Sequence, residues 1–281
     1  MQGTAAGPFG FERRTYDAQR VRARRTRFVF TDDIPRYWLG GNPARTHLVN
    51  ALHLFLPPFE RMLAQTVRHA ALPALVDPLL RQQARGYMAQ EAVHARCHAL
   101  FAERLRAQGY QLDRYLAALD GLFGGLRRRL GGKLGLAVMA AFEHYTRVFV
   151  ALTFDTDFLA GCHPAVRELL DWHAAEEVEH GSIAFDLLQA IAPGRALRIA
   201  GSVLALLLLY AGLLAGSALL SWQDGSLLRG ATLSELATFF VGKYRVAQDA
   251  ARLFADYARV DYRPQLSDYS QAASAILSPV S

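Results

Sequence analysis

The sequence has little cysteine and little of the patterning that β-strands need. Cys97 and Cys162 are its two cysteines among 281 residues, and they stand far apart without a metal-type spacing. This excludes a disulfide framework and favours a reducing compartment. Alternating apolar and polar residues are scarce, whereas leucine and alanine runs are dense and 52% of the residues are apolar. We therefore expect an all-α protein.

The N-terminus lacks the apolar core of a secretory signal, since residues 1–14 read MQGTAAGPFGFERR. We therefore expect the active domain in the cytoplasm. Residues 13–27 carry seven arginines and one acid, Asp17. Such a stretch can contact anionic lipid, nucleic acid or only water. Because no nucleic-acid-binding signature accompanies it, we expect no nucleic-acid partner and interpret residues 1–40 as a basic irregular N-terminal arm, mostly solvated.

One long segment has no charged residue at all. Residues 199–222 read IAGSVLALLLLYAGLLAGSALLSW, and Arg195 and Arg198 precede them. A run of about 20 apolar residues is long enough to cross a bilayer, and such a helix can also lie in the membrane surface. The alternatives are a buried helix and a homodimer interface. We expect membrane association through residues 199–222, without deciding between spanning and surface binding.

Proline and glycine divide the remaining chain into helices. A helix begins near Pro43, with Asn42 as its cap, and the Pro57-Pro58 pair breaks or kinks it. The glycine-rich stretch at 124–135 is interpreted as a loop, and it lacks the lysine-serine ending of a phosphate loop. Further helices are predicted from Pro78 to about residue 106, over 133–154 and from Pro164 to residue 193.

These elements give a division of the chain into parts. After the arm, residues 41–195 form the predicted four-helix metal-binding bundle. Residues 196–265 form a long hydrophobic helix and an amphipathic C-terminal helix, and residues 266–281 form a flexible tail.

Each of the four predicted bundle helices carries an acid at a position where its pattern favours an apolar residue. Two of these acids belong to Glu-x-x-His pairs, whose members lie on one stripe of a helix because they are three residues apart. One Glu from each of two helices and a Glu-x-x-His pair from each of the other two form the ligand set of a dinuclear metal site in a four-helix bundle. The predicted ligands are Glu60, Glu91, His94, Glu143, Glu177 and His180.

The charge balance supports two metal ions. A buried, unpaired carboxylate costs several kcal/mol or takes up a proton. Four glutamates that face one core repel one another, and two divalent cations neutralise them. Histidine and carboxylate ligands suit iron best, with manganese as the alternative.

Several other residues lie near the predicted ligands. His173 precedes Glu177 by one turn and is a predicted seventh ligand, although a core histidine is the alternative. Glu176 competes with Glu177, but only Glu177 has a histidine three residues later. Glu179 points about 120° away and is expected to be solvated or paired with a basic residue. Four residues are candidates to contact the ligands: Tyr87, His98, Arg147 and Glu176. For Tyr87 and Arg147 the alternative is packing or exposure to solvent, and for His98 the alternatives are a role as a ligand or as a core histidine.

The same segments resemble a known family. NALHLFLPPFERM, GYMAQEAVHARCH, AAFEHYTRV, WHAAEEVEHGSIAFDL and YARVDYRP are similar to segments of the ferritin-like family labelled predicted metal-dependent hydrolase. This resemblance covers most of residues 20–265 and implies a ferritin-like bundle. The chain has PPFE where the family usually has Pro-x-Gly-Glu. The H-x-x-x-E-x-x-H pattern that ends at His180 also resembles the di-iron arylamine N-oxygenases, whose site uses the extra histidine.

Three functions fit this reading. The first is a di-iron enzyme that activates O2 to oxidise a small or lipid-like substrate with an external electron donor. The second is a metal-dependent hydrolase that uses a metal-activated water. The third is a non-catalytic iron-handling protein. The sequence favours the first, because no separate general acid or anion-binding clamp for a hydrolase substrate is evident.

Overall fold

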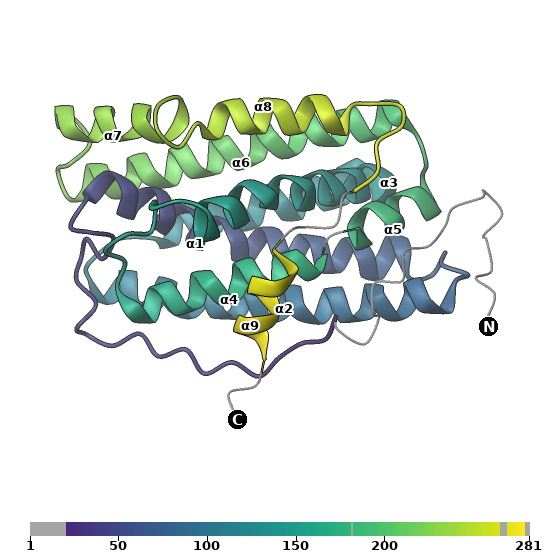
Figure 1. The fold of residues 1–281 in the computed structure, drawn as a ribbon, viewed down its shortest axis with the longest axis horizontal. Helices are drawn as coiled ribbons and strands as arrows, with labels where there is room; N and C mark the ends of the chain where they lie inside the picture. Colours follow the sequence, from purple (N-terminus) through teal and green to yellow (C-terminus); the bar gives the residue numbers. More distant parts are fainter. Residues whose placement is uncertain (1–20, 181, 265–268, 279–281) are drawn as a thin grey trace.

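The computed structural model describes residues 21–180, 182–264 and 269–278. Within these ranges the chain is helical and has no β-strand, which confirms the expected all-α fold (Figure 1). The helices are α1 (Pro43–Thr66), α2 (Pro78–Ala107), α3 (Asp113–Phe154), α4 (Pro164–His180), α5 (Ile183–Ile191), α6 (Arg195–Gln223), α7 (Gly230–Phe240), α8 (Val246–Tyr257) and α9 (Ser270–Leu277), with a π-helical turn η1 (Val67–Ala71) after α1.

The first two helices begin where the sequence predicts. The Asn42 side chain accepts a hydrogen bond from the Arg45 amide at 3.0 Å, and Asp77 caps α2 in the same way through Leu79. The sequence predicted a break or a kink at Pro57-Pro58, and the break is wrong, because α1 continues through both prolines to Thr66. Both prolines are buried, and α1 packs against α2, α3 and α6. Tertiary packing therefore maintains a helix that local propensity would end.

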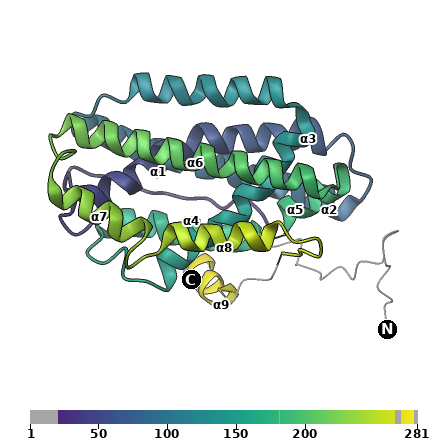
Figure 2. The ribbon, with the colours of Figure 1, turned by 90° about the horizontal axis from the view of Figure 1, so that it is seen from above.

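The glycine-rich stretch is helical, which corrects the loop expected at 124–135. Gly131 alone has non-helical backbone angles, with φ at 69° and ψ at 166°, a combination that residues with a side chain rarely adopt. The chain turns sharply there, so that α3 consists of an outer segment before Gly131 and an inner segment after it (Figure 2). The inner segment places Glu143 in the core.

The long apolar helix α6 lies along α1 and α3 (Figures 1 and 2). It contacts them through small residues, including Gly201, Gly212 and Gly216, all of which are buried. A Cβ atom at Gly201 would lie 2.5 Å from the carbonyl carbon of Ala137, and one at Gly212 would lie 2.4 Å from the Phe55 ring. These glycines allow α6 to approach the other helices closely along one face.

The C-terminal part differs from the expected layout. Two helices, α7 and α8, replace the single amphipathic helix, and Arg245 between them has a positive φ of 52°. The expected fourth helix is also divided into α4 and α5, and Gly181 between them lies outside the described residues. Residues 270–277 form α9, which packs on α4 where a flexible tail was expected.

The close contact of α6 gives a test of the packing. We expect Gly201→Ala to destabilise the fold by about 1–3 kcal/mol, because its new methyl group would overlap the Ala137 backbone. Gly230→Ala is the matched control, since a Cβ at Gly230 has no atom within 4 Å. Urea unfolding followed by circular dichroism measures both. Equal midpoints for the two variants would contradict the close packing of α6.

Candidate metal centre

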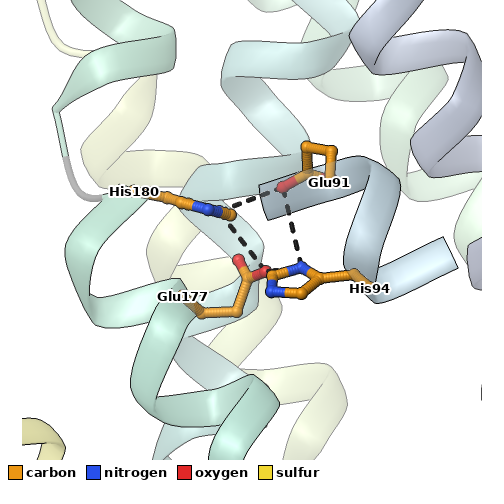
Figure 3. A group of neighbouring side chains, drawn as sticks. All are labelled: Glu91, His94, Glu177 and His180. Carbon is orange, nitrogen blue, oxygen red and sulfur yellow. Dashed lines mark ion pairs between the residues drawn. The ribbon is translucent and has the colours of Figure 1, made fainter. Parts of the chain in front are cut away.

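Four helices bring the predicted ligands to one buried place. Figure 3 shows Glu91 and His94 from α2 facing Glu177 and His180 from α4. Glu60 projects from α1 and Glu143 from the inner segment of α3. The two Glu-x-x-His pairs meet because each presents both side chains on one helix stripe. All seven predicted ligands, His173 included, are buried.

The Glu177 carboxylate lies at the middle of this group. Its Oε1 atom is 3.0 Å from His173 Nε2, 3.4 Å from His180 Nδ1 and 3.6 Å from His94 Nδ1. His180 Nδ1 also lies 3.2 Å from Glu91 Oε1 and 3.4 Å from Glu143 Oε2. These contacts bring together oxygen and nitrogen atoms from three helices, α2, α3 and α4.

The ligand atoms form two overlapping groups. Glu91, His94, Glu177 and His180 each offer an atom within 4.8 Å of the others, and so do Glu60, His94 and His173. Atoms that share one metal ion at about 2.1 Å lie about 3 to 4 Å apart. Each group could therefore hold one ion, and His94 belongs to both.

Many polar atoms of this cluster have no hydrogen-bond partner although they are buried. They are both carboxylate oxygens of Glu60, Glu91 Oε1, His94 Nδ1, Glu143 Oε2, Glu177 Oε2 and both ring nitrogens of His180. A buried polar atom without a partner costs about 1–3 kcal/mol, and more when it is charged. Because metal coordination would satisfy these atoms at once, the residues present fit a divalent-metal site.

Burial and mutual repulsion set the protonation of the metal-free cluster. Burial raises the pKa of Glu60 and of Glu91 well above the usual range, and neighbouring carboxylates contribute to the shift. Burial also raises the pKa of Glu143 to about 7. Burial opposes ionisation of Glu177 too, but His180 and His173 hold its pKa well below normal. Without metal, the cluster therefore retains protons that a cation would displace.

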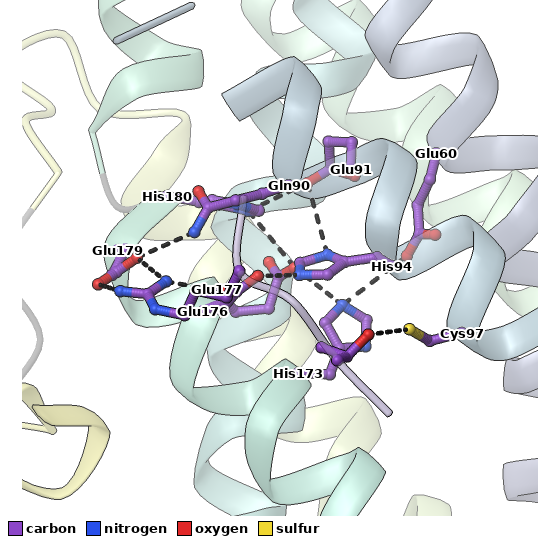
Figure 4. Close-up of polar contacts among 12 residues, drawn as sticks. Glu60, Gln90, Glu91, His94, Cys97, His173, Glu176, Glu177, Glu179 and His180 are labelled. Carbon is purple, nitrogen blue, oxygen red and sulfur yellow. Dashed lines mark hydrogen bonds and ion pairs between the residues drawn. The ribbon is translucent and has the colours of Figure 1, made fainter. Parts of the chain in front are cut away.

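The arm contributes a side chain that orients His94. Glu176 Oε2 lies 2.8 Å from His94 Nε2, and Arg24 donates to Glu176 Oε1 at 2.7 Å (Figure 4). With its Nε2 held by Glu176, His94 turns its Nδ1 toward Glu91 and Glu177. Burial lowers the pKa of His94 to about 4, so its ring is neutral at pH 7. A neutral imidazole that is fixed from behind is suited to metal binding.

Arg24 also binds Glu179, which was expected to be solvated or paired with a basic residue. The guanidinium donates to both carboxylate oxygens of Glu179, at 2.7 and 2.8 Å, and Gln90 donates to the same carboxylate at 3.0 Å. The pairing part of the expectation is therefore confirmed. The expectation of a solvated arm is wrong for Val21, which is buried, and for Arg24, which is half-buried.

A row of imidazoles extends from the other side of the centre. His98 Nε2 lies 2.8 Å from His173 Nδ1, and His98 Nδ1 lies 2.6 Å from His53 Nδ1. All three rings are buried. With its Nδ1 held by His98, His173 directs Nε2 toward Glu177 and Glu60. His98 therefore lies behind a predicted ligand, one of the alternatives that the sequence left open.

The two remaining neighbours behave differently. Tyr87 is buried and its hydroxyl donates to Glu143 Oε1 at 2.6 Å, so it contacts a predicted ligand. Arg147 is exposed, and in the described part of the chain it forms no hydrogen bond or ion pair with the cluster. It lies on α3 one turn beyond Glu143, with its side chain exposed to solvent. The structure therefore does not bring Arg147 to the ligands.

Two cavities border the centre. An apolar cavity of about 120 Å³ contacts Glu60, Glu91, Glu143, His173 and Glu177, and its other walls are mostly aliphatic and aromatic side chains of α1, α3, α6, α7 and α8. A second cavity of about 400 Å³ also contacts Glu143 and Glu177, and its lining mixes apolar side chains with polar ones such as Arg147 and Arg252. The centre therefore borders an apolar space on one side and a more polar space on another.

Comparison with known proteins agrees with this geometry. The model of the family described as "predicted metal-dependent hydrolase" matches residues 22–268. The chain belongs to this family. Neither the curated proteins nor the solved structures give a significant match. The family and the buried histidine and glutamate cluster together support a divalent-metal site, and both are silent on which metal it holds.

The sequence reasoning did not find three residues of the site. They are Arg24, Gln90 and His53, and each acts through another side chain. Arg24 is one of seven arginines in residues 13–27, so nothing in the local sequence distinguishes it from the other six. His53 lies in α1 two turns before Glu60, and that spacing was the one available signal. Contacts between distant segments determine these roles.

The position of Arg24 predicts an effect on metal affinity. Arg24→Gln should weaken metal binding about 10–100-fold, because Glu176 and through it His94 lose their support. Arg25→Gln is the matched control, since Arg25 is exposed on the same arm. Competition with a chromophoric chelator measures both affinities. If the two variants bind metal equally well, Arg24 does not orient the ligand.

The raised carboxylate pKa values predict how the metal-free protein responds to pH. A group whose pKa is higher in the folded protein stabilises it at low pH and loses this contribution as the pH rises through the folded value. Glu143 titrates near pH 7. Burial would lower the pKa of His180, but the carboxylates around it raise that pKa well above the normal value. Buried histidines with lowered pKa values, such as His53 and His94, act in the opposite direction, and this effect fades above about pH 6.5, where histidines of the unfolded chain lose their protons.

The metal-free protein should therefore lose thermal stability between about pH 6.5 and 8. Scanning calorimetry of the chelator-treated protein measures this loss. Glu143→Gln, which cannot ionise, should reduce the slope. The affinity of the protein for metal should rise over the same pH range, because metal binding displaces protons. A metal-free protein that becomes more stable from pH 6.5 to 8 would contradict the assignment of these protons.

Proposed function

We propose that this protein is a dinuclear metal enzyme that uses O2 to oxidise a small or lipid-like apolar substrate. The proposed ligands are Glu60, Glu91, His94, Glu143, His173, Glu177 and His180. Iron is the favoured metal, with manganese as the alternative, because mixed histidine and carboxylate sets suit both. Two bound iron ions would supply the reduction of O2, and an external donor would supply the electrons.

The apolar cavity is the observation that carries the proposal. Its described lining contains no lysine or arginine, and its carboxylates and its one imidazole all belong to the proposed ligand set. The rest includes Leu56, Phe142, Leu209 and Phe240. A pocket of this kind selects a substrate by shape and apolar surface, and it excludes water from reactive species. A hydrolase acting on a charged substrate would need a polar group to orient that substrate.

The side chains around the proposed ligands would keep the ligands in position and in a fixed protonation state during the reaction. Tyr87 donates its hydroxyl proton to Glu143 Oε1, which fixes that carboxylate and leaves Oε2 toward His180. Glu176 and His98 fix the two imidazoles, His94 and His173, from behind. The positions of the ligands therefore depend on these contacts, and a reaction with O2 would need no nucleophile from the protein.

A metal-dependent hydrolase remains the second candidate, supported by the family description and by one feature of the structure. The polar cavity of about 400 Å³ reaches Glu143 and Glu177 and could admit water and an anionic substrate past Arg147. In this reading the metal ions would lower the pKa of a bound water.

Oxygen uptake decides between these candidates. Wild-type protein reconstituted anaerobically with Fe(II) should bind two iron ions per chain, as expected for the dinuclear ligand set, and consume about one O2 per two irons. Glu177→Ala should lose both metal and uptake, since its carboxylate lies between three imidazoles. Glu168→Gln, an exposed position on the same helix, should behave like wild type.

The other outcomes point elsewhere. Two tightly bound metals without O2 uptake would contradict the oxidase and favour the hydrolase. Uptake of iron well beyond two per chain would indicate iron handling. Binding of iron to Glu177→Ala as tightly as to wild type would contradict the proposed ligand set itself.

A further inference from the structure

The outer face of α6 is an uncharged stripe. Ala200, Val203, Leu207, Ala211 and Leu214 are exposed and follow one another at intervals of three or four residues, which places them on one side of the helix. Leu207 is 62% exposed, and Trp222 continues the stripe at 70%. From Ala200 to Trp222 this stripe is about 33 Å long. No other described element covers it.

Helix α7 and the turn before it extend this face. Leu228, Leu233 and Val241 are exposed by 90%, 60% and 61%. The exposed positions between Leu233 and Val241 are Ser234 and Ala237. Figure 1 shows α6 and α7 on the same side of the molecule, above α1. We define the outer stripe of α6 and the exposed apolar residues 228–241 as the apolar face. An exposed apolar surface of this extent marks a site of interaction.

The opposite side of α6 argues against a membrane-spanning helix. Gly201 and Gly212 lie against Ala137 and Phe55, and the Tyr115 hydroxyl donates to the Gly212 carbonyl at 2.7 Å. A spanning orientation would remove these contacts and would carry the bundle, with its buried ionisable groups, toward the hydrocarbon. The helix is therefore suited to lie flat, with the packed side on the protein and the stripe outward.

Basic side chains lie beside the apolar face. The outer segment of α3 runs along α6 (Figure 2), and its consecutive Arg127, Arg128 and Arg129 are exposed. Arg127 and Leu208 of α6 line a common pocket with Lys133. Residues 124–135 and α6 contain no acid, so this positive charge has no nearby partner within either segment. Anionic lipid headgroups attract such a cluster.

The apolar cavity reaches the same side of the molecule. Leu206, Leu209 and Leu213 of α6 line it together with Phe239 and Phe240 of α7. The helices that carry the exposed apolar face therefore also form the wall of the cavity that borders Glu143 and Glu177. The helices that would face the lipid therefore also border the space beside the centre.

From these observations we propose that the apolar face of α6 and α7 docks on an anionic lipid surface, with the arginines of α3 at the headgroups. The docking itself is independent of the metal chemistry, whereas delivery of an apolar substrate from the bilayer rests on the proposed function. A surface-bound helix of this kind buries its apolar side at the boundary between headgroups and acyl chains.

Sedimentation with vesicles tests the docking on the full chain. Wild-type protein should bind vesicles of phosphatidylcholine with phosphatidylglycerol more tightly than phosphatidylcholine alone, and added salt should weaken the binding. The double variant Leu207→Gln, Leu214→Gln should lose affinity about tenfold or more, because both side chains leave the bilayer. Val76→Gln with Val260→Gln is the matched control, since both valines are exposed outside the apolar face. This control should bind like wild type.

A third variant separates the charge from the apolar contact. Arg127→Gln, Arg128→Gln, Arg129→Gln should lose the preference for anionic vesicles and the salt dependence while still binding weakly. Circular dichroism melting of each variant checks that the fold is retained. Exposed substitutions of this kind usually leave stability nearly unchanged.

Several results would overturn the docking. One such result is wild-type protein that stays in solution with every kind of vesicle. A second is equal vesicle binding by the leucine and valine variants. The third comes from sedimentation velocity: if wild type does not bind vesicles but forms a dimer that the leucine variant abolishes, the face binds a second copy of the chain. Normal O2 uptake in solution alongside any of these results would leave the proposed function standing and reject the docking alone.

Discussion

The concentration of ionisable groups in one dry core is the constraint on which this structure depends. Four glutamates and three histidines share a space where burial, together with the neighbouring carboxylates, raises the pKa of Glu60, Glu91 and Glu143. Carboxylates in such a place must be neutralised by protons or by cations. The many unpaired oxygen and nitrogen atoms in the cluster favour cations, since protons would leave most of these atoms without partners.

The surrounding residues are arranged to keep these groups in position. The arm, α2 and α4 are joined through Arg24, Glu176 and His94, while α1 and α2 are joined behind His173 by His53 and His98. These contacts lie between segments that are distant in the chain. They therefore hold the helices at fixed separations as well as orienting single side chains. Support of the site and cohesion of the fold depend on the same interactions.

The C-terminal helices give this centre an apolar approach. Their inner surfaces cover one side of the helical core, where small residues such as Gly201 and Gly212 allow close contact, and they form part of the wall of the apolar cavity. Their outer surfaces stay exposed. One face of α6 therefore packs in the fold, and the other is available for interaction. This explains why only one-third of its apolar stretch is buried although it is rich in leucine.

The sequence by itself determined the helical fold and the side chains that meet in the core. Spacing of three and four residues places Glu91 with His94 and Glu177 with His180 on single helix faces, and this periodicity is a local property of the chain. The residues at which helices end were harder to predict from the sequence. Pro57 and Pro58 lie within α1, and the glycine-rich stretch of α3 is helical, because packing overrides local preference at both places.

Tertiary structure alone decided what surrounds these side chains. Nothing in residues 13–27 distinguishes Arg24 from its neighbours, since its role exists only where Glu176 and Glu179 of α4 lie within 2.8 Å. The same holds for Arg147. Its spacing of one helical turn from Glu143 suggested a contact with the site, but its side chain extends to solvent. Periodicity fixes the face of a helix. Which distant segment covers that face depends on contacts between elements, and no local pattern records them.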